Sequence, residues 1–438
     1  MRTIAWAVVI ACVVAGGPAW AQTTPLSIDE AVARALKESH RAAELRARRE
    51  GAEAAAEGRA AARRPQLSAQ GGYTRTNHVD EFGVPQPNGL TRIIYPDIPD
   101  NYRTRLDLAW PLYTGGRAES LARAARADAG AAAQDVASLE ADLGLEVTRA
   151  YWNAVTAAHT AHVVEQALAR TDSHLKDLRE RLEAGFIPPN DVLSAEAQRS
   201  RHEVQVIEAR NASEVALAEL RRLTGLEPGL RLDLTTPLDA VRPPDPEDLA
   251  AQVARAKGAR PDRAALVRRL DGAAARVSAA GASRRPSVAV NAGVDYARPN
   301  TRIFPRRSAW EDSWDVSVNA AWSLWDGGRR AAEVGETTAA ERALRARLAE
   351  FDSLVELDVR QRRLDLEAGR AAATAAADGV RSAAEARRVV GERFTAGVAT
   401  STDVLDAQVA LLQAELDRAR ALAAVRIAEA RLARTLGQ

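Results

Sequence analysis

Apolar and polar residues alternate along four short segments of the chain. The clearest run extends from Trp314 to Leu324, where apolar residues at every second position are separated by Asp, Ser, Asn, Ala and Ser. On an extended strand, neighbouring side chains point to opposite faces. The same alternation recurs over residues 67–73, 106–112 and 288–296. The pattern predicts two strands in each half of the chain, near 65–75, 103–114, 286–297 and 313–325.

A second period, of three to four residues, runs through most of the remaining chain. No proline interrupts residues 118–181, where apolar positions such as Val136, Leu139, Leu143 and Val147 recur. At 1.5 Å per residue, a helix of this length extends about 95 Å. Such a helix cannot be buried in one small domain, so we expect it to pack side by side with other long helices.

The chain contains an internal duplication. The segment LAWPLYTGGR (108–117) returns as AAWSLWDGGR (320–329), an offset of 212 residues. The same offset relates Gly185 to Gly397 and a downstream Asp-Val-Leu in each half. A constant offset over so many matches indicates two structural repeats.

Each repeat is expected to contain a helix, two strands and a long helical hairpin, in that order. The first covers 22–225 with its hairpin at 117–225, and the second covers 247–438 with its hairpin at 328–437. A Pro-rich linker at 226–246 separates them. The first repeat has nine more residues between its strands, in a polar segment near 76–101 that we interpret as an exposed loop.

The first 21 residues have the features of a secretory signal peptide. They contain Arg2, an apolar run and the sequence Ala19-Trp20-Ala21 before Gln22. Lipidation at Cys12 is a weaker alternative. No later segment contains the roughly 18 to 20 apolar residues of a membrane-spanning helix, so an exported chain of this kind would have to cross a membrane with strands.

Composition and motifs exclude several functions. Hydrophobic residues make up 46% of the chain but aromatic residues only 4%, as expected for closely packed, alanine-rich helices. Removal of Arg2 leaves 59 basic and 59 acidic residues, which gives no reason to expect a nucleic-acid partner. The sequence has no Walker, HExxH, GxSxG or nucleotide-binding motif, so we expect neither an enzyme nor a cofactor.

One spacing is compatible with a metal site. His159 and His162 are three residues apart and Glu165 follows. No fourth ligand lies nearby in the sequence. We therefore interpret these residues as a polar stripe on a helix and predict no metal.

The strand segments resemble transmembrane strands. Alternation more often comes from a half-buried sheet in a soluble domain. Here the segments are about ten residues long and end in Trp or Tyr, as in outer-membrane barrels, and few residues remain to cover an apolar face. The expected membrane girdle consists of Tyr73, Trp110, Tyr113, Tyr296, Trp314, Trp322 and Trp325.

Four strands are too few to close a barrel. An open sheet in lipid would leave unpaired backbone amides at its edges, and the smallest bacterial barrels have eight strands. Several chains must therefore share one barrel. Two copies give eight strands with little lumen, whereas three give twelve strands and room for a channel.

Each helical hairpin turns at a glycine. Gly185 and Gly397 suit the left-handed residue that ends a helix. Asn190 and Thr402 suit the cap of the next helix. The acids that follow, at positions 191 and 403, are also what the helix dipole favours in a first turn.

These turns belong to a set of motifs that resembles the TolC family of outer membrane efflux proteins, the exit ducts of tripartite pumps and type I secretion systems. The other motifs are LSIDEAVARAL (26–36), the corners YTGGR and WDGGR, and the terminal LRRLTG and LARTLG. The resemblance implies an α+β membrane protein of the outer membrane that extends into the periplasm. Its fold would be a long α-helical coiled-coil barrel plus a transmembrane β-barrel with four strands per chain, assembled as a homotrimer.

The resemblance also implies partners and site residues. In this family the periplasmic turns meet an adaptor (membrane fusion) protein, which connects the duct to an inner-membrane pump of the RND or ABC type. The corresponding turn residues here are Gly185, Phe186, Asp191, Gly397, Val398 and Thr402. The periplasmic gate would lie at Asp403 and Asp406, with Phe394 at the position of a common aromatic residue. Aspartates three apart share a helix face, so a trimer would form two carboxylate rings that attract cations.

The chain departs from one version of the family pattern. Ala399 occupies a position where some members have a basic residue that pairs with an acid and holds the entrance shut. Pro188 and Pro189 should stiffen the first turn. Two alternatives are a periplasmic adaptor-like protein, which would show one hairpin between Gly-rich halves, and a structural coiled-coil envelope protein, which would not need the strands.

Overall fold

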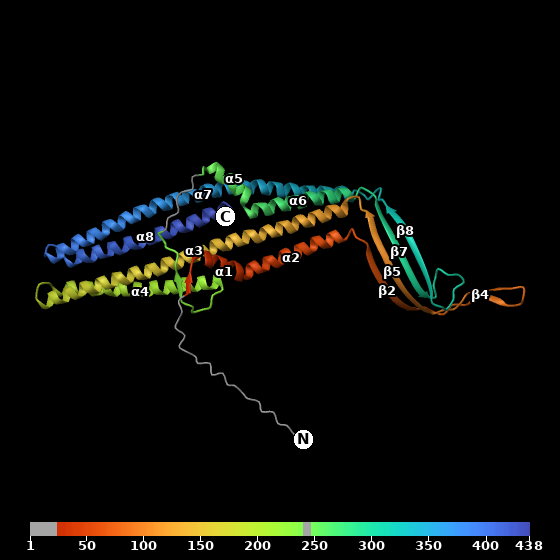
Figure 1. Ribbon diagram of the computed structural model, residues 1–438, viewed down its shortest axis with the longest axis horizontal. Coiled ribbons are helices and arrows are strands. Elements are labelled where there is room, and N and C mark those ends of the chain that lie inside the picture. Colours follow the sequence, from red (N-terminus) through yellow and green to blue (C-terminus); the bar gives the residue numbers. More distant parts are fainter. Residues whose placement is uncertain (1–23, 240–246) are drawn as a thin grey trace, which may run out of the picture. The chain divides into compact units, whose positions relative to one another are not determined.

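The computed structural model describes residues 24–239 and 247–438, which form two compact units (Figure 1). Unit 1 comprises the described residues of Met1–Ala42, Leu139–Ala256 and Glu356–Gln438, and unit 2 comprises Ala43–Ser138 and Lys257–Val355. The expected signal peptide, Cys12 and the last part of the linker lie outside the described residues.

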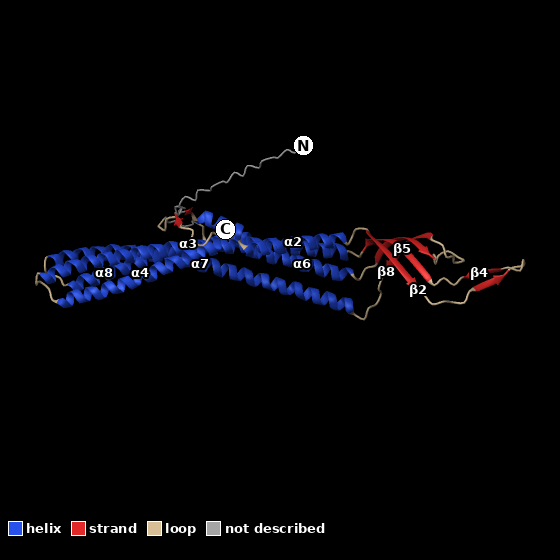
Figure 2. Cartoon of the chain, turned by 90° about the horizontal axis from the view of Figure 1, so that it is seen from below, coloured by secondary structure: helices blue, strands red, loops and turns tan. Residues whose placement is uncertain are grey.

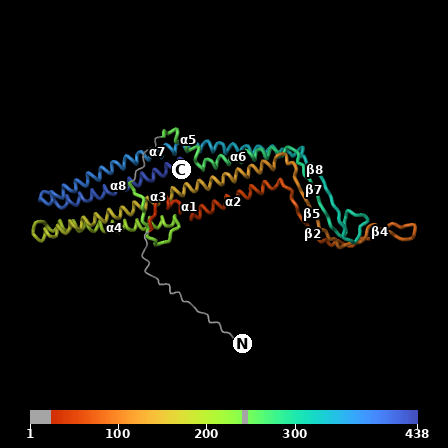
Figure 3. The backbone as a smooth tube through the Cα atoms, in the orientation of Figure 1, coloured from red at the N-terminus to blue at the C-terminus, as the bar shows by residue number. Residues whose placement is uncertain are grey.

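Unit 1 is built around two helical hairpins. Helix α3 (Arg117–Glu183) returns as α4 (Pro189–Thr224), and α7 (Arg329–Thr395) returns as α8 (Ser401–Thr435) (Figure 3). The helices α3 and α7 have 67 residues each, about 100 Å at 1.5 Å per residue. Both also contribute residues to unit 2.

The duplication is visible in the backbone angles. Gly185 and Gly397, at the two hairpin turns, have φ of 77° and 78°. The glycine pairs at the corners before α3 and α7 also match at the same offset, with φ of 67° and 68°, then 89° and 92°. Equal angles at equivalent positions mean that the sequence repeat is also a structural repeat.

Unit 1 also contains a short parallel pair of strands. Strand β1 (Thr24–Leu26) pairs with β6 (Leu232–Leu234), which lies in the segment that we interpreted as linker. The buried hydroxyl of Tyr151 donates to the carbonyl of Leu26 and accepts the amide of Thr236. The three-residue strand is too short to produce a visible alternation in the sequence.

The helix expected at the start of each repeat is divided in two. Helix α1 (Ile28–Glu38) ends at Ser39, which has an extended backbone, and α2 (His40–Ala61) follows. In the second repeat, α5 (Leu249–Ala259) and α6 (Pro261–Ala282) are separated by Arg260. The break at Arg260 is caused by Pro261, because a proline disfavours helical backbone in the residue before it.

Unit 2 contains a four-stranded antiparallel sheet in the order β2-β5-β7-β8 (Figure 1). Its strands are drawn in red in Figure 2. The strands are β2 (Gln66–Arg75), β5 (Asp100–Tyr113), β7 (Ser287–Arg298) and β8 (Glu311–Ala321). A separate small hairpin, β3 (Phe82–Pro85) with β4 (Thr91–Tyr95), occupies the segment that we had interpreted as a loop. Its proline and glycine content concealed it in the sequence.

Strand β8 is shorter than the alternation suggested. It ends at Ala321, although the alternating pattern continues to Leu324. The partner strand begins at Ser287, which pairs with Ala321, so no backbone is available for pairing further along. Trp322, Leu324 and Trp325 are therefore exposed residues of the corner that leads into α7.

Candidate functional site

The register of the sheet separates apolar from polar side chains. Two rows across the four strands are apolar: Leu67, Leu108, Ala292 and Val316, then Ala69, Leu106, Val294 and Trp314. The row between them is mostly polar: Ser68, Asp107, Gly293 and Asp315. Because alternate rows lie on opposite faces, one face of the sheet is apolar and the other carries the charges.

Burial on this sheet is inverted relative to a soluble protein. On the apolar face Trp314 is 71% and Val318 is 68% exposed. On the polar face of β7, Gly293, Asp295 and Ala297 are buried. A half-covered sheet in water buries its apolar face instead. An exposed apolar surface of this extent marks contact with a lipid or a partner.

Aromatic residues stand at both ends of the apolar face. Trp110, Tyr113, Trp322 and Trp325 lie at the end that joins the helices, and Tyr73, Tyr296 and Trp314 lie toward the other end. The sequence interpretation missed two members of the far group, Tyr102 and Trp310. Ring centroids are 5.0 Å apart both between Tyr73 and Tyr102 and between Tyr296 and Trp310.

The spacing of the two aromatic groups fits a membrane. Tyr102 and Trp110 of β5 are eight residues apart. At about 3.3 Å per residue this is about 26 Å, close to the apolar band of about 25 Å in outer-membrane barrels. None of the helices in residues 24–239 and 247–438 is long and apolar enough to cross a membrane.

The tips of the two hairpins present apolar side chains. Phe186 is 80% exposed and Val398, at the equivalent repeat position, is 65% exposed. The amide of Phe186 donates to the carbonyl of Arg181, and that of Val398 donates to Arg393, both at 2.9 Å. These bonds cap the C-terminal ends of α3 and α7 and hold the backbone of the tip so that both side chains point into solvent. Each tip therefore offers a small apolar knob.

Asp403 belongs to the capping box at the start of α8. Its carboxylate accepts the backbone amide of Thr400 at 2.8 Å and the Thr400 hydroxyl at 2.7 Å, and the hydroxyl accepts the amide of Asp403 at 3.2 Å. The amide and then the hydroxyl of Thr400 hold the pKa of Asp403 below its usual range. Asp403 and Asp406 are both exposed, whereas Val404 and Leu405 between them are buried.

Two predicted caps were wrong. Helix α8 is capped by Thr400 rather than Thr402, because Thr400 can form a reciprocal capping box with Asp403. Helix α4 begins at Pro189 rather than after Asn190, because proline suits the first helical position. Both helices therefore begin two residues earlier than the sequence suggested, so Asp191 and Asp403 are each the third residue of their helix and not the first.

Phe394 lies in the interior of unit 1. It is buried in a cluster that includes Leu178, Val404 and Leu405. The ring meets His174 edge-on with centroids 5.2 Å apart, and the guanidinium of Arg181 lies 4.4 Å from the ring centroid. Phe394 therefore joins the two hairpins just behind the tips. Ala399, half-buried, packs against the same cluster.

A buried polar layer also joins the hairpins. His202 of α4 is 1% exposed, and its Nδ1 lies 2.9 Å from the hydroxyl of Thr171 of α3. The same hydroxyl lies 3.3 Å from Oε1 of Gln408 in α8. Nε2 of His202 lies 2.9 Å from the amide nitrogen of Gln198. Helices from both repeats thus contribute to one hydrogen-bonded layer.

This layer requires neutral His202. Oε1 of Gln198 already accepts two bonds from Arg201, at 2.9 and 2.5 Å, so the amide group of Gln198 must turn its N–H toward His202. Nε2 of His202 is then an acceptor and cannot carry a proton. Burial, followed by the charges of Arg201 and Arg170, lowers the pKa of His202.

His174 lies in a similar environment. Its Nε2 is 3.2 Å from the hydroxyl of Ser401. Burial lowers the pKa of His174, Asp177 acts in the opposite direction, and Arg181 lowers it further. Both histidines therefore resist protonation while the hairpins are packed together.

We expect acid to weaken the packing of the hairpins. Above the ordinary histidine pKa of 6.5 both histidines are neutral in the folded and unfolded states. As the pH falls below 6.5, the unfolded chain binds protons that the folded chain excludes, so stability falls until the lowered folded pKa is reached. The loss per histidine grows with the distance by which the folded-state pKa lies below 6.5.

Thermal unfolding followed by circular dichroism between pH 7.5 and 5.5 measures this effect. The slope of the unfolding midpoint with pH should be shallower in His202→Gln than in the wild type. Replacement of the exposed His40 by Gln serves as the control and should leave the slope unchanged. Equal slopes for all three proteins would contradict the assignment.

The histidine pair considered for metal binding has other partners. His162 lies 2.8 Å from the amide nitrogen of Gln166, and Glu165 pairs with Arg210 at 2.7 Å. Within residues 24–239 and 247–438, no group of three or more His, Cys, Asp or Glu side chains is arranged to hold a metal ion.

A sheet with an exposed apolar face and two long helical hairpins in one chain are the features of an outer membrane channel subunit. The chain belongs to the outer membrane efflux protein family, which it matches over residues 31–226 and 253–438. It is a TolC-like efflux protein of the outer membrane that extends into the periplasm. Channels of this family are passive conduits rather than enzymes, and they are trimers that work with an adaptor and an inner-membrane pump.

Individual relatives agree with this assignment. Protein CyaE of Bordetella pertussis is 29% identical over 305 residues, which cover 69% of this chain and 63% of that relative. The fold is similar to that of VceC from Vibrio cholerae, with a TM-score of 0.78, 18% identity, and 94% and 96% of the two chains covered. It is also similar to the open state of MtrE from Neisseria gonorrhoeae, with a TM-score of 0.77, 19% identity, and coverage of 94% and 88%.

Proposed function

We propose that the protein is the outer membrane exit duct of a tripartite efflux pump or a type I secretion system. The observation that carries this proposal is the inverted sheet, whose apolar face is exposed and whose polar face carries the charges and is buried along part of β7. Lipid would contact the apolar face, and the polar face would line water. A passive conduit needs nothing more from its wall than this polarity.

The open edges of the sheet support a trimer. Strands β2 and β8 end the order β2-β5-β7-β8 and are paired on one side each. In lipid, each unpaired edge amide costs several kcal/mol, so β8 of one chain should pair with β2 of the next. Three chains give a closed barrel of twelve strands, which has room for a channel.

The gate is assigned to Asp403 and Asp406. Both side chains are exposed on one side of the first turns of α8, while Val404 and Leu405 face the interior. Three chains would bring six carboxylates together at the periplasmic entrance, where they would favour cations. Because Ala399 cannot form an ion pair, we assign closure to the packing of Phe394 between the hairpins.

The hairpin tips are assigned to the adaptor. Phe186 and Val398 are exposed apolar residues at equivalent positions of the two repeats, so a trimer would present six similar knobs. The helical hairpins of several adaptor copies, arranged in a ring, would bind these repeated apolar side chains. The inner-membrane pump, of the RND or ABC type, would act through this adaptor.

Photo-cross-linking in cells tests the tip assignment. A photoreactive residue at position 398 should capture a periplasmic protein that contains a long helical hairpin, identified by mass spectrometry. The same residue at the exposed Glu227 should not capture it. Capture of the same protein from both positions, or of no envelope protein from position 398, would contradict the assignment.

A further inference from the structure

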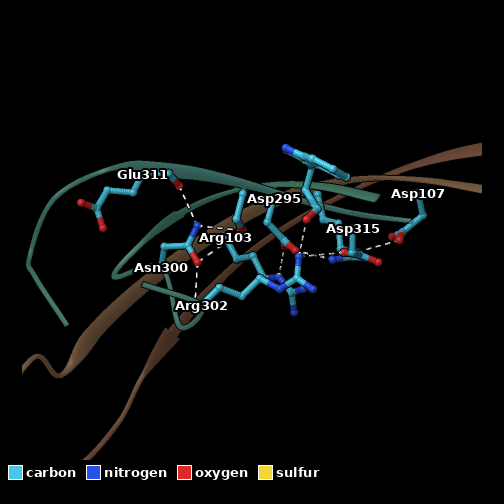
Figure 4. Close-up of polar contacts among 10 residues, drawn as sticks. Arg103, Asp107, Asp295, Asn300, Arg302, Glu311 and Asp315 are labelled. Atoms are coloured by element: carbon cyan, nitrogen blue, oxygen red, sulfur yellow. Dashed lines mark hydrogen bonds and ion pairs between the residues drawn. The ribbon is translucent and has the colours of Figure 1, made fainter. Parts of the chain in front are cut away.

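One arginine connects three strands on the polar face of the sheet. Nε of Arg105, on β5, donates to Asp107 of the same strand at 2.6 Å. Nη1 bonds to Asp295 of β7, and Nη2 donates to Asp315 of β8 at 3.1 Å. Arg103 adds a second bond to Asp295 at 2.5 Å. We refer to these five residues as the Arg105 network (Figure 4).

The network depends on a glycine. Gly293 lies on β7 between the strands that carry Arg105 and Asp315. A Cβ atom added at Gly293 would collide with the guanidinium, with Cζ of Arg105 at 2.6 Å. Because Gly293 has no side chain, the side chain of Arg105 can extend across β7 and reach Asp315 on β8.

The loop between β7 and β8 folds onto the same face. Asn300 is 2% exposed, and its amide donates to the carbonyl of Glu311 and to the hydroxyl of Ser313, both at 3.0 Å. Arg302 donates to the carbonyl of Trp314 at 2.6 Å and pairs with Asp315 at 3.4 Å (Figure 4). Asp315 thus connects the loop to the Arg105 network.

Loop and sheet enclose a polar cavity. Its volume is about 510 Å³, and its lining includes Arg103, Arg105, Asp295, Asn300 and Arg302. The loop therefore covers part of the polar face instead of extending away from the strands. This cover explains why Asp295 and Ala297 are buried on the face that would otherwise be open to water.

We propose that the Arg105 network and the β7–β8 loop form a second constriction, at the barrel end of the conduit. This inference rests on the proposed function, in which the polar face lines the lumen. The loop of each of three chains would project inward and narrow the exit. Three arginines, at 103, 105 and 302, balance three aspartates, at 107, 295 and 315, so this constriction should select by size rather than by the sign of charge.

The first test measures whether the loop covers the face. In a chain without Cys12, Ala297→Cys supplies a single thiol beneath the loop. We expect slow reaction with a polar maleimide, fast reaction when Arg302→Ala is added, and slow reaction when Arg307→Ala is added. Arg307 is the matched control because it lies in the same loop, carries the same charge and pairs with Glu311. Equal rates in all three chains would overturn the proposal.

The second test measures the size of the exit. It uses the Phe394→Ala background, in which the packing that we assign to closure of the periplasmic entrance is removed, so that the entrance no longer limits the current. Adding Arg302→Ala should raise single-channel conductance at least about twofold and admit larger polyethylene glycols from the outer side. Adding Arg307→Ala should do neither. Identical conductance and size limits for the two variants would overturn the constriction.

The two tests separate this proposal from the proposed function. If the thiol is protected as expected but no variant conducts, both the proposed conduit function and the exit constriction are contradicted. If all variants conduct and the thiol reacts fast in every chain, the conduit stands and the constriction alone is overturned.

Discussion

A chain that carries Val318→Arg is expected to be missing from the assembled outer-membrane fraction, whereas one that carries Asn319→Arg should accumulate there. Val318 lies midway between Trp314 and Trp322 on the apolar face, where it pairs with Val290. An arginine on the lipid-facing side costs from about 1 kcal/mol near an interface to about 2–4 kcal/mol at the midplane, and a trimer bears this cost three times. Asn319 is the next residue on the opposite face, so the same arginine there meets water.

The pair of variants is matched in strand, depth and charge. Membrane fractionation and the yield of trimer that resists mild detergent measure assembly. Loss of both variants would indicate that β8 does not tolerate arginine at all. Equal assembly of both would contradict a lipid-facing apolar side, because the prediction depends on the face and not on the residue type.

The second large effect is expected at the periplasmic entrance. Replacing Asp403 and Asp406 by Asn should reduce the cation-to-anion permeability ratio to about one, because the charge that favours cations is removed. Asparagine keeps a carbonyl that can accept the bonds from Thr400, so the helix cap survives. The ratio is obtained from reversal potentials in planar bilayers with a salt gradient.

Two further variants isolate the charge effect. Asp403→Ala/Asp406→Ala removes the charge and also the carboxylate half of the capping box, so it should lose selectivity and also show a less stable current. Asp191→Asn removes one acid at the equivalent position of the first hairpin and should leave most of the selectivity intact. If Asp191→Asn has the larger effect, the gate lies in the first repeat and our assignment is wrong.

The alternation of side chains predicted the four strands of the β2-β5-β7-β8 sheet and their two faces, but not the short pairs β1-β6 and β3-β4. The period of two is a local property, and the row of Leu67, Leu108, Ala292 and Val316 follows once the strands pair. The long helices were also predictable because alanine-rich repeats without proline allow little else. Adaptor-like and coiled-coil interpretations account for the hairpins but not for a sheet whose apolar face is exposed.

The side-chain chemistry of the site was not predictable in the same way. Arg105 meets partners 190 and 210 residues away, and nothing in the sequence near Arg105 or Gly293 signals the crossing. Phe394 was placed at the gate by family position, but its partners come from other helices and bury it. The cap at Thr400 was missed because three neighbouring residues, Thr400 to Thr402, all have hydroxyl groups suited to capping.

The single-channel current of the wild-type protein tests the central claim most directly. Purified trimer added to a planar bilayer should produce discrete, small current steps. Under a salt gradient, the reversal potential of this current should shift toward the equilibrium potential of the cation. The Asp403→Asn/Asp406→Asn protein, measured beside it, should also produce steps, without that shift. Folded protein from the outer membrane that gives no steps in either form would contradict the conduit.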